Sequence, residues 1–348
     1  MTFRFRAIAI VMAALAGLLI VSVASAGSNG QGKDQSKHDE IVSFWTAERI
    51  ADAKPRDISR GPGADSKDPA KKPDNPGGGN GNGGGGGKPG GGDSAVKGAE
   101  WTGGGVVQGT TGKVLFEMDG GLYVCSGSVV NDGAIAGNSM VLTAGHCVYD
   151  EVAKAFATNF MFMPDFDAST TGDALDCPTT PYGCWTATAL VTTTAWANRD
   201  FNDDYAFAVI GNGGHSGNAS LEGEVGTQDI AFGQSHPTSV HLFGYPHAFP
   251  YDGTVLTYCS GTDLSDPYGE TTFGLKCDMT GGSSGGPWFT DFDAATGKGT
   301  LTSVNSYKYN RGKYSSYMFG PYFDDYTLAT FTAAKSALGD GLIDDPSP

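Results

Sequence analysis

The stretch VLTAGHCV, residues 141–148, indicates both a strand and a reactive side chain. An apolar run ends in Thr-Ala-Gly, and His146 and Cys147 follow directly. A short run rich in Val and Leu that ends at a glycine is typical of a buried strand. The end of a strand is a rigid support, and an imidazole there can act as a general base near neutral pH. Because a single histidine is more often structural, the rest of the chain has to decide its role.

The segments around this stretch have the composition of an all-β protein. From about residue 96 onward, short runs rich in Val, Thr, Tyr and Phe alternate with Gly, Asn, Asp and Pro. This alternation is typical of a β-sandwich or β-barrel. One late helix is expected over residues 327–338, TLATFTAAKSAL, because Gly339 follows as a stop signal.

A second motif, DDYAFAVI at residues 203–210, places two acids before another apolar run. A carboxylate buried at such a position is costly unless a partner compensates its charge. A histidine N–H is a suitable partner and would fix the tautomer of the ring. Asp204 directly precedes the apolar run and is the candidate for this pair, whereas Asp203 is expected to be solvated.

A third motif, MTGGSSGGPW at residues 279–288, could be a flexible linker or a turn around a reactive hydroxyl. Its neighbours Cys277 and Phe289 suit an ordered turn. Acyl transfer requires backbone N–H groups aimed at the developing oxyanion. Gly282 permits the unusual backbone angles that aim one such group, and the N–H of Ser284 would be the second.

The chain before residue 95 differs from the rest. Residues 1–26 have the basic start, apolar run and small-residue end of a signal peptide, with an uncleaved membrane anchor as the alternative. We interpret residues 27–75 as a propeptide, and a disordered extension is the alternative. Residues 76–94 are glycine-rich and are expected to form a flexible linker. The main domain then spans residues 95–348 of a secreted protein.

Charge is unevenly distributed along the chain. Residues 1–94 carry 12 basic and 10 acidic side chains, a net of +2, whereas residues 95–348 carry 10 and 28, a net of −18. Such an acidic domain would repel phosphates, which argues against a nucleic-acid partner. The acidic segment at residues 165–173 lacks the spacing of an EF-hand. We therefore expect a solvated loop and no cofactor, with a structural Ca2+ as the alternative.

The cysteines indicate an oxidising compartment. Their number is six, which is even, and in an exported protein this predicts three disulfides. Many pairings are open, and no CxxC pair points to a metal site. The sequence neighbours, whose pairing we predict, are Cys125–Cys147, Cys177–Cys184 and Cys259–Cys277.

The order TAGHC, an acid before YAF, then GGSSGGP resembles the motifs of chymotrypsin/trypsin-like serine proteases. The resemblance covers about residues 106–338. The segment CDMTGGSSGGP and the long polar leader look most like secreted bacterial members related to glutamyl endopeptidases. The resemblance implies two β-barrels, roughly residues 105–215 and 225–325, with a short C-terminal helix.

The resemblance also implies a role for each motif. His146 matches the general base of the family, Asp204 the orienting acid and Ser284 the nucleophile. The amides of Gly282 and Ser284 match the oxyanion hole. The disulfide of Cys147 matches the one that ties the histidine loop to a neighbouring strand.

Three residues bear on activation and specificity. Ser283 stands where trypsin has the aspartate that pairs with a newly freed amino terminus, so that mode of activation is not implied. Asp278 stands where trypsin-like enzymes select Arg or Lys. Asn305 lies near the position where glutamate-selective members have a histidine. Asp278 and Asn305 are the candidate specificity residues, and the sequence favours neither preference.

These observations predict a secreted serine endopeptidase, made as a zymogen, that cleaves proteins or peptides through an acyl-enzyme. A non-catalytic binding protein on the same fold is an alternative, because a fold does not imply a function. An esterase using the same triad is another. We expect a monomer that has no membrane contact once its signal peptide is removed.

Overall fold

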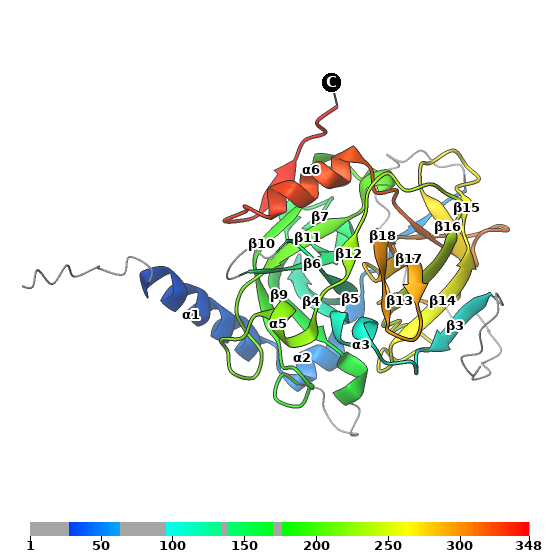
Figure 1. Cartoon of the computed structure of the whole chain (residues 1–348). Coiled ribbons are helices and arrows are strands. Elements are labelled where there is room, and N and C mark those ends of the chain that lie inside the picture. The colour runs from blue at the N-terminus through cyan, green and yellow to red at the C-terminus, as the bar shows by residue number, and fades with distance from the viewer. Residues whose placement is uncertain (1–27, 63–94, 134–137, 170–175, 348) are drawn as a thin grey trace, which may run out of the picture.

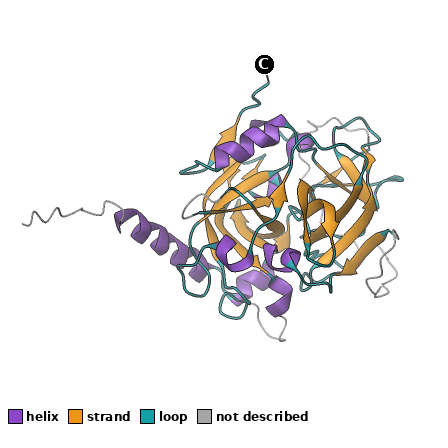
Figure 2. Cartoon of the chain, in the orientation of Figure 1, coloured by secondary structure: helices purple, strands orange, loops and turns teal. Residues whose placement is uncertain are grey.

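The computed structural model describes residues 28–62, 95–133, 138–169 and 176–347 (Figure 1). The predicted signal peptide and glycine-rich linker lie outside these residues. Two groups of strands lie next to each other, with short helices at their edges (Figure 2). The predicted all-β class is confirmed.

The first group of strands closes into an antiparallel barrel. Closure comes from β5, which pairs with β4 on one side and with β6 on the other. The inward faces carry apolar side chains that exclude water, and this burial is the main stabilising contribution to such a core. The barrel strands, in spatial order, are β4 (Thr111–Met118), β5 (Gly121–Val130), β6 (Ser139–Thr143), β11 (Ala206–Ile210), β10 (Trp185–Thr193) and β9 (Thr158–Pro164).

The second group consists of a six-stranded sheet and a smaller three-stranded sheet. The six-stranded sheet has the order β12 (Asp229–Ile230), β18 (Lys298–Val304), β17 (Pro287–Asp293), β13 (Ser239–Gly244), β14 (Thr257–Thr262) and β3 (Val96–Glu100). The smaller sheet contains β15 (Leu264–Ser265), β16 (Phe273–Lys276) and β20 (Tyr317–Gly320). Two of the three sequence motifs include strands β6 and β11 of the first group, and the third leads into β17 of the second.

The leader packs against the main domain. Helix α1 (Ser28–Phe44) contacts β9 and β10, and α2 (Ala47–Asp52) follows it. Trp45 is buried, and its indole N–H donates to the carbonyl oxygen of Asn159 at 2.6 Å. In the described part of the chain, no helix combines the length and apolarity needed to cross a membrane.

Four further short helices and several short strands complete the fold. The C-terminal helix α6 spans Asp325–Ala334 and contacts β10 and β11. It begins before the predicted start because Asp324 caps it, accepting from the N–H groups of Tyr326 and Thr327. Further elements include α3 (Val106–Thr110), α4 (Thr194–Ala197), α5 (Leu221–Val225), β7 (Tyr149–Asp150), β8 (Ala155–Phe156) and β21 (Gly341–Ile343).

All six cysteines are paired in the structure. The disulfides join Cys125 to Cys147, Cys177 to Cys184 and Cys259 to Cys277. The first of them links β5 to the turn that carries His146. The histidine turn is therefore attached covalently to the barrel.

Removing the Cys125–Cys147 disulfide by a double change to Ala should lower the free energy of unfolding by about 3 kcal/mol, because this disulfide closes the longest of the three loops. The Cys177–Cys184 double change is the matched control and should cost about 2 kcal/mol, since its loop is shorter. Denaturant titration measures both values. A larger loss for the control would contradict the prediction.

Candidate active site

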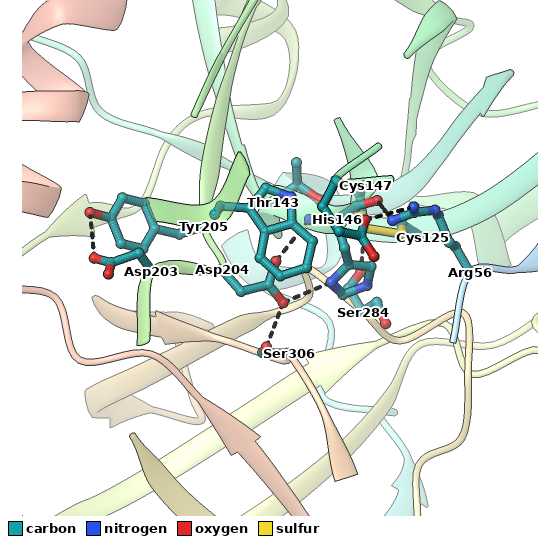
Figure 3. A network of polar contacts seen from close by, with 12 residues as sticks. Arg56, Cys125, Thr143, His146, Cys147, Asp203, Asp204, Tyr205, Ser284 and Ser306 are labelled. Carbon is teal, nitrogen blue, oxygen red and sulfur yellow. Dashed lines mark hydrogen bonds and ion pairs between the residues drawn. A yellow bond between two sulfur atoms is a disulfide. The ribbon is translucent and has the colours of Figure 1, made fainter. Parts of the chain in front are cut away.

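His146 lies in the 3-10 turn Gly145–Cys147, directly after strand β6. Its ring is fully buried, and its Nδ1 lies 2.7 Å from Oδ2 of Asp204. The backbone N–H of His146 donates to Oδ1 of the same carboxylate at 2.8 Å. One carboxylate thus holds both the ring and the backbone of the histidine (Figure 3).

Asp204 lies two residues before the start of β11 and has no exposed surface. Its Oδ2 also accepts a hydrogen bond from the Ser306 hydroxyl at 2.5 Å. Burial alone would raise the pKa of Asp204, but the charge of His146 and the hydrogen bonds from His146 and Ser306 bring it below its ordinary value. Asp204 therefore stays ionised and can stabilise an imidazolium. Ser306 was not predicted, because no local pattern distinguishes it from the other serines.

Asp203, the neighbouring acid, is half-buried rather than solvated. It accepts a hydrogen bond from the Tyr205 hydroxyl at 3.4 Å. Burial, followed by repulsion from nearby acids such as Asp200, raises its pKa to about 7. The two adjacent carboxyl groups therefore have opposite shifts in pKa, and only Asp204 contacts the histidine.

Ser284 lies in the turn that precedes β17. This turn requires left-handed backbone angles at Gly282, with φ of 95°, and at Gly285, with φ of 78°. Its backbone is bound to the first barrel, because the N–H of Ser126 donates to the carbonyl oxygen of Ser284 at 2.7 Å. The second group of strands thereby presents Ser284 to His146 of the first group.

The two adjacent serines have different surroundings. Ser283 is fully buried, and its hydroxyl donates to the carbonyl oxygen of Thr280 at 2.8 Å. Ser284 lies beside the His146 ring (Figure 3), and its carbonyl oxygen is 3.9 Å from Sγ of Cys147. Among the described residues, Nε2 of His146 is buried and has no hydrogen-bond partner. The Ser284 hydroxyl is therefore not hydrogen-bonded to Nε2 in this structure.

Backbone amides in the serine turn alternate between bonded and available. The N–H of Ser283 donates to Thr280, and that of Gly285 donates to Asn305 at 2.7 Å. Within the described residues, the amides of Gly282 and Ser284 donate to no backbone carbonyl. This is the arrangement that binding of an external oxyanion requires.

The two candidate specificity residues lie outside the cavity at Ser284. Asp278 is exposed and accepts a hydrogen bond from the Tyr251 hydroxyl at 2.5 Å. Asn305 is fully buried, and its Nδ2 donates to the carbonyl oxygens of Phe243 at 2.8 Å and Ser283 at 3.0 Å. In this position Asn305 supports the serine turn from behind.

The buried sulfur and nitrogen atoms near His146 do not form a metal site. The candidate ligand atoms of Cys125, His146 and Cys147 lie within 4.8 Å of one another, close enough to surround a metal ion. However, the two cysteines form a disulfide, so they offer no thiolate. The acidic segment at residues 165–173 is described only up to residue 169, and Asp165 accepts a hydrogen bond from Gln108 at 2.7 Å. Calcium binding there stays a prediction.

A cavity of about 680 Å³ opens at Ser284, and leader residues 56–59 form part of its wall. Strand β1 (Lys54–Pro55) pairs in parallel with β5 at Tyr123 and Val124. Strand β2 (Ser59–Arg60) pairs in parallel with β19 (Lys308–Tyr309). The leader thus adds one short strand to each rim, and the residues between these strands cross the cavity.

Asp57 is the leader residue that lies at the centre of this crossing. A Cβ atom on Gly281 would come within 1.7 Å of its Oδ1, so only glycine leaves room for it. Burial raises the pKa of Asp57, while the charges of His146 and Lys308 lower it. Burial also lowers the pKa of Lys308 to about 8, and its ammonium donates to the carbonyl oxygen of Cys277 at 2.7 Å.

Comparison with known proteins gives a consistent result. The family model described as lysyl endopeptidase, C-terminal domain, matches residues 98–208. The thermostable serine protease AL20 from an extremophilic microorganism is 39% identical, covers 67% of this chain and 100% of its own, and has a TM-score of 0.57. The protease Anisep from Arthrobacter nicotinovorans is 41% identical, covers 66% of this chain and 96% of its own, and has a TM-score of 0.55. No match was found among curated proteins.

A more distant structure, a Glu endopeptidase in complex with MPD, is 17% identical, with coverage of 70% and 98% and a TM-score of 0.50. At that identity the likeness concerns the fold. The likeness to AL20 shows the family, because it extends over the whole of that protein at 39% identity. The chain belongs to the chymotrypsin/trypsin-like serine protease family.

Proposed function

We propose that this serine-type endopeptidase is secreted and cleaves peptide bonds through a triad of Ser284, His146 and Asp204. The observation that carries the proposal is the buried pair of His146 and Asp204, whose free Nε2 lies at the side of the ring next to Ser284. In this arrangement Asp204 fixes the tautomer and orientation of the imidazole.

The reaction follows from these positions. His146 takes the proton of the Ser284 hydroxyl as the oxygen attacks the carbonyl carbon of the substrate. The negative charge that develops on the carbonyl oxygen is bound by the amides of Gly282 and Ser284. His146 then returns the proton to the leaving amine, which leaves an acyl group on Ser284. Water, activated by the same histidine, hydrolyses this acyl-enzyme.

Replacing Ser284 with Ala should abolish peptide hydrolysis, whereas replacing Ser283 should leave most of it, because the Ser283 hydroxyl is buried and bonded to Thr280. A serine-directed covalent inhibitor should add its mass to Ser284 in wild type and in Ser283→Ala. Mass spectrometry of the labelled peptide distinguishes the two serines. Labelling of Ser283 alone would contradict the assignment of the nucleophile.

The adjacent acids offer a matched pair of variants. Asp204→Asn should lower kcat by about 10⁴-fold, because the imidazole loses the carboxylate that fixes its tautomer. Asp203→Asn should leave kcat near that of wild type, since Asp203 does not contact His146.

The same pair predicts a pH dependence of stability. The raised pKa of Asp203, about 7, means that its ionisation costs stability as pH rises from about 4 through 7. Asp203→Asn should therefore raise the free energy of unfolding by about 1 kcal/mol at pH 8, a value reduced for the partial exposure of the group. At pH 4 the gain should vanish. Denaturant titration at both pH values checks this, and a gain of equal size at pH 4 would exclude the electrostatic cause.

Export and a zymogen form belong to the same proposal. The apolar run within residues 1–26 and the three disulfides support passage into an oxidising compartment. The position of leader residues 54–60 across the cavity at Ser284 supports an inactive precursor, since a substrate would have to displace them.

In the uncut chain, Ser284 should therefore react slowly with the covalent inhibitor. Replacing both Arg56 and Arg60 with Gln should speed labelling by about tenfold or more, because these two residues carry the leader's ion pairs with the rims. Arg49→Gln is the matched control, since the Arg49 side chain contacts Phe44 within the leader and makes no ion pair with a rim among the described residues. Equal labelling rates in all three proteins would show that the leader does not restrict access.

A further inference from the structure

The leader contacts the two rims of the cavity through its arginines. Arg56 approaches Glu151 at 3.0 Å and Asp150 at 3.7 Å, and it donates to the carbonyl oxygen of His146 at 2.6 Å. The Arg56 residue is buried. This contact lies on the side of the cavity where β1 pairs with β5.

Arg60 makes the corresponding contact at the other end. It donates to Glu270 at 2.8 Å, and its guanidinium lies over the rings of Phe201 at 4.8 Å and Tyr307 at 5.3 Å. A guanidinium placed between a carboxylate and aromatic faces is bound by charge and by cation–π attraction together. Only 4% of the surface of Arg60 is exposed, so solvent screens this pair weakly.

Both acidic sites are organised by the protease domain itself. Oδ1 of Asp150 accepts from the N–H groups of Val152 and Ala153, each at 2.8 Å. Oε2 of Glu270 accepts from Nδ2 of Asn202 at 2.9 Å, and Asn202 is held in turn by the N–H of Thr271. The carboxylates of Asp150, next to Glu151 in the chain, and of Glu270 therefore do not depend on the leader for their orientation, and they would stay in place for another ligand.

We infer that the cleft contains two subsites for basic side chains. One is at Glu151, on the side of the first barrel, and the other is at Glu270, in the second group of strands. Substrates with two arginines or lysines separated by three residues, with the cleaved bond between them, would fill both. In the uncut chain Arg56 and Arg60, which have this spacing, occupy the subsites. The inference rests on the proposed function and names the substrate class for that site.

Two observations bear on how this pattern of two arginines relates to chain direction and to the trypsin-like position. Both leader residues are arginines, so the pattern is the same whichever way a bound chain runs through the cleft. The family match over residues 98–208 includes Glu151 and ends before Glu270, and Asp278 does not line the cavity. The Glu270 subsite therefore lies outside the matched segment, and neither subsite uses the trypsin-like position.

Two peptides test the inference, and the protein is used after it has been cut between residues 63 and 94 and the leader fragment has been separated from it. One peptide carries Arg at both positions around the cleaved bond, and in the other both are Gln. Active sites are counted by covalent labelling of Ser284, so that rates refer to folded enzyme. The doubly basic peptide should have a kcat/KM about tenfold or more above that of its partner, and the ratio should fall at high salt.

Variants assign the effect to the two subsites. A peptide with a single Arg at one of the two positions should be cleaved no faster than the Gln peptide once Glu151 is replaced with Gln. A peptide with a single Arg at the other position should behave in the same way with Glu270→Gln. Cleavage of the Gln peptide itself should change by less than about twofold in either variant. Glu224→Gln, an exposed acid on α5, is the matched control and should change no ratio. This crossed pattern is the result that subsites at these two acids predict.

Three results would overturn the inference while leaving the proposed function intact. Equal rates for the two peptides would exclude basic subsites, and so would variants that lower both rates alike while Ser284 is still labelled. A preference for one Arg that neither variant changes would place recognition elsewhere. If Ser284 is not labelled and neither peptide is cut, the proposed function fails, and the inference fails with it.

Discussion

The hydrogen-bonded pair of His146 and Asp204 is the interaction on which the rest of the site depends. Both side chains are fully buried, and an uncompensated charge at this depth would be strongly unfavourable. The domain compensates Asp204 from three directions, with the histidine ring, the histidine backbone and the Ser306 hydroxyl. Because Ser306 belongs to the second group of strands, this carboxylate also joins the two halves of the molecule.

The same junction holds the turn that carries Ser284. The serine turn is bound on one side by Ser126 of the first barrel and on the other by Asn305 of the second half. A turn held from both sides keeps its hydroxyl and amides in fixed positions, which is how preorganised sites stabilise a transition state without further rearrangement. The site is therefore a property of the interface between the two halves.

The leader uses this interface too. It pairs with one strand on each rim and binds acids on each rim with an arginine, in a domain whose net charge is strongly negative. Charge complementarity of this kind favours association and is sensitive to ionic strength. A basic segment is thus a natural ligand of the cleft, whether it belongs to the leader or to a substrate.

The sequence by itself determined the all-β class, the order of the three motifs and the pairing of cysteines that are neighbours along the chain. These follow from local periodicity, turn residues and short loops, which a linear pattern records. Only the tertiary structure decided that Ser306 binds Asp204, that Asp278 lies outside the cavity, and that Asn305 supports the serine turn. Likewise, the contacts of Arg56 and Arg60 with Glu151 and Glu270 join residues about 95 and 210 positions apart. Such contacts depend on how the two halves pack against each other, and a pattern of neighbouring residues carries no information about that packing.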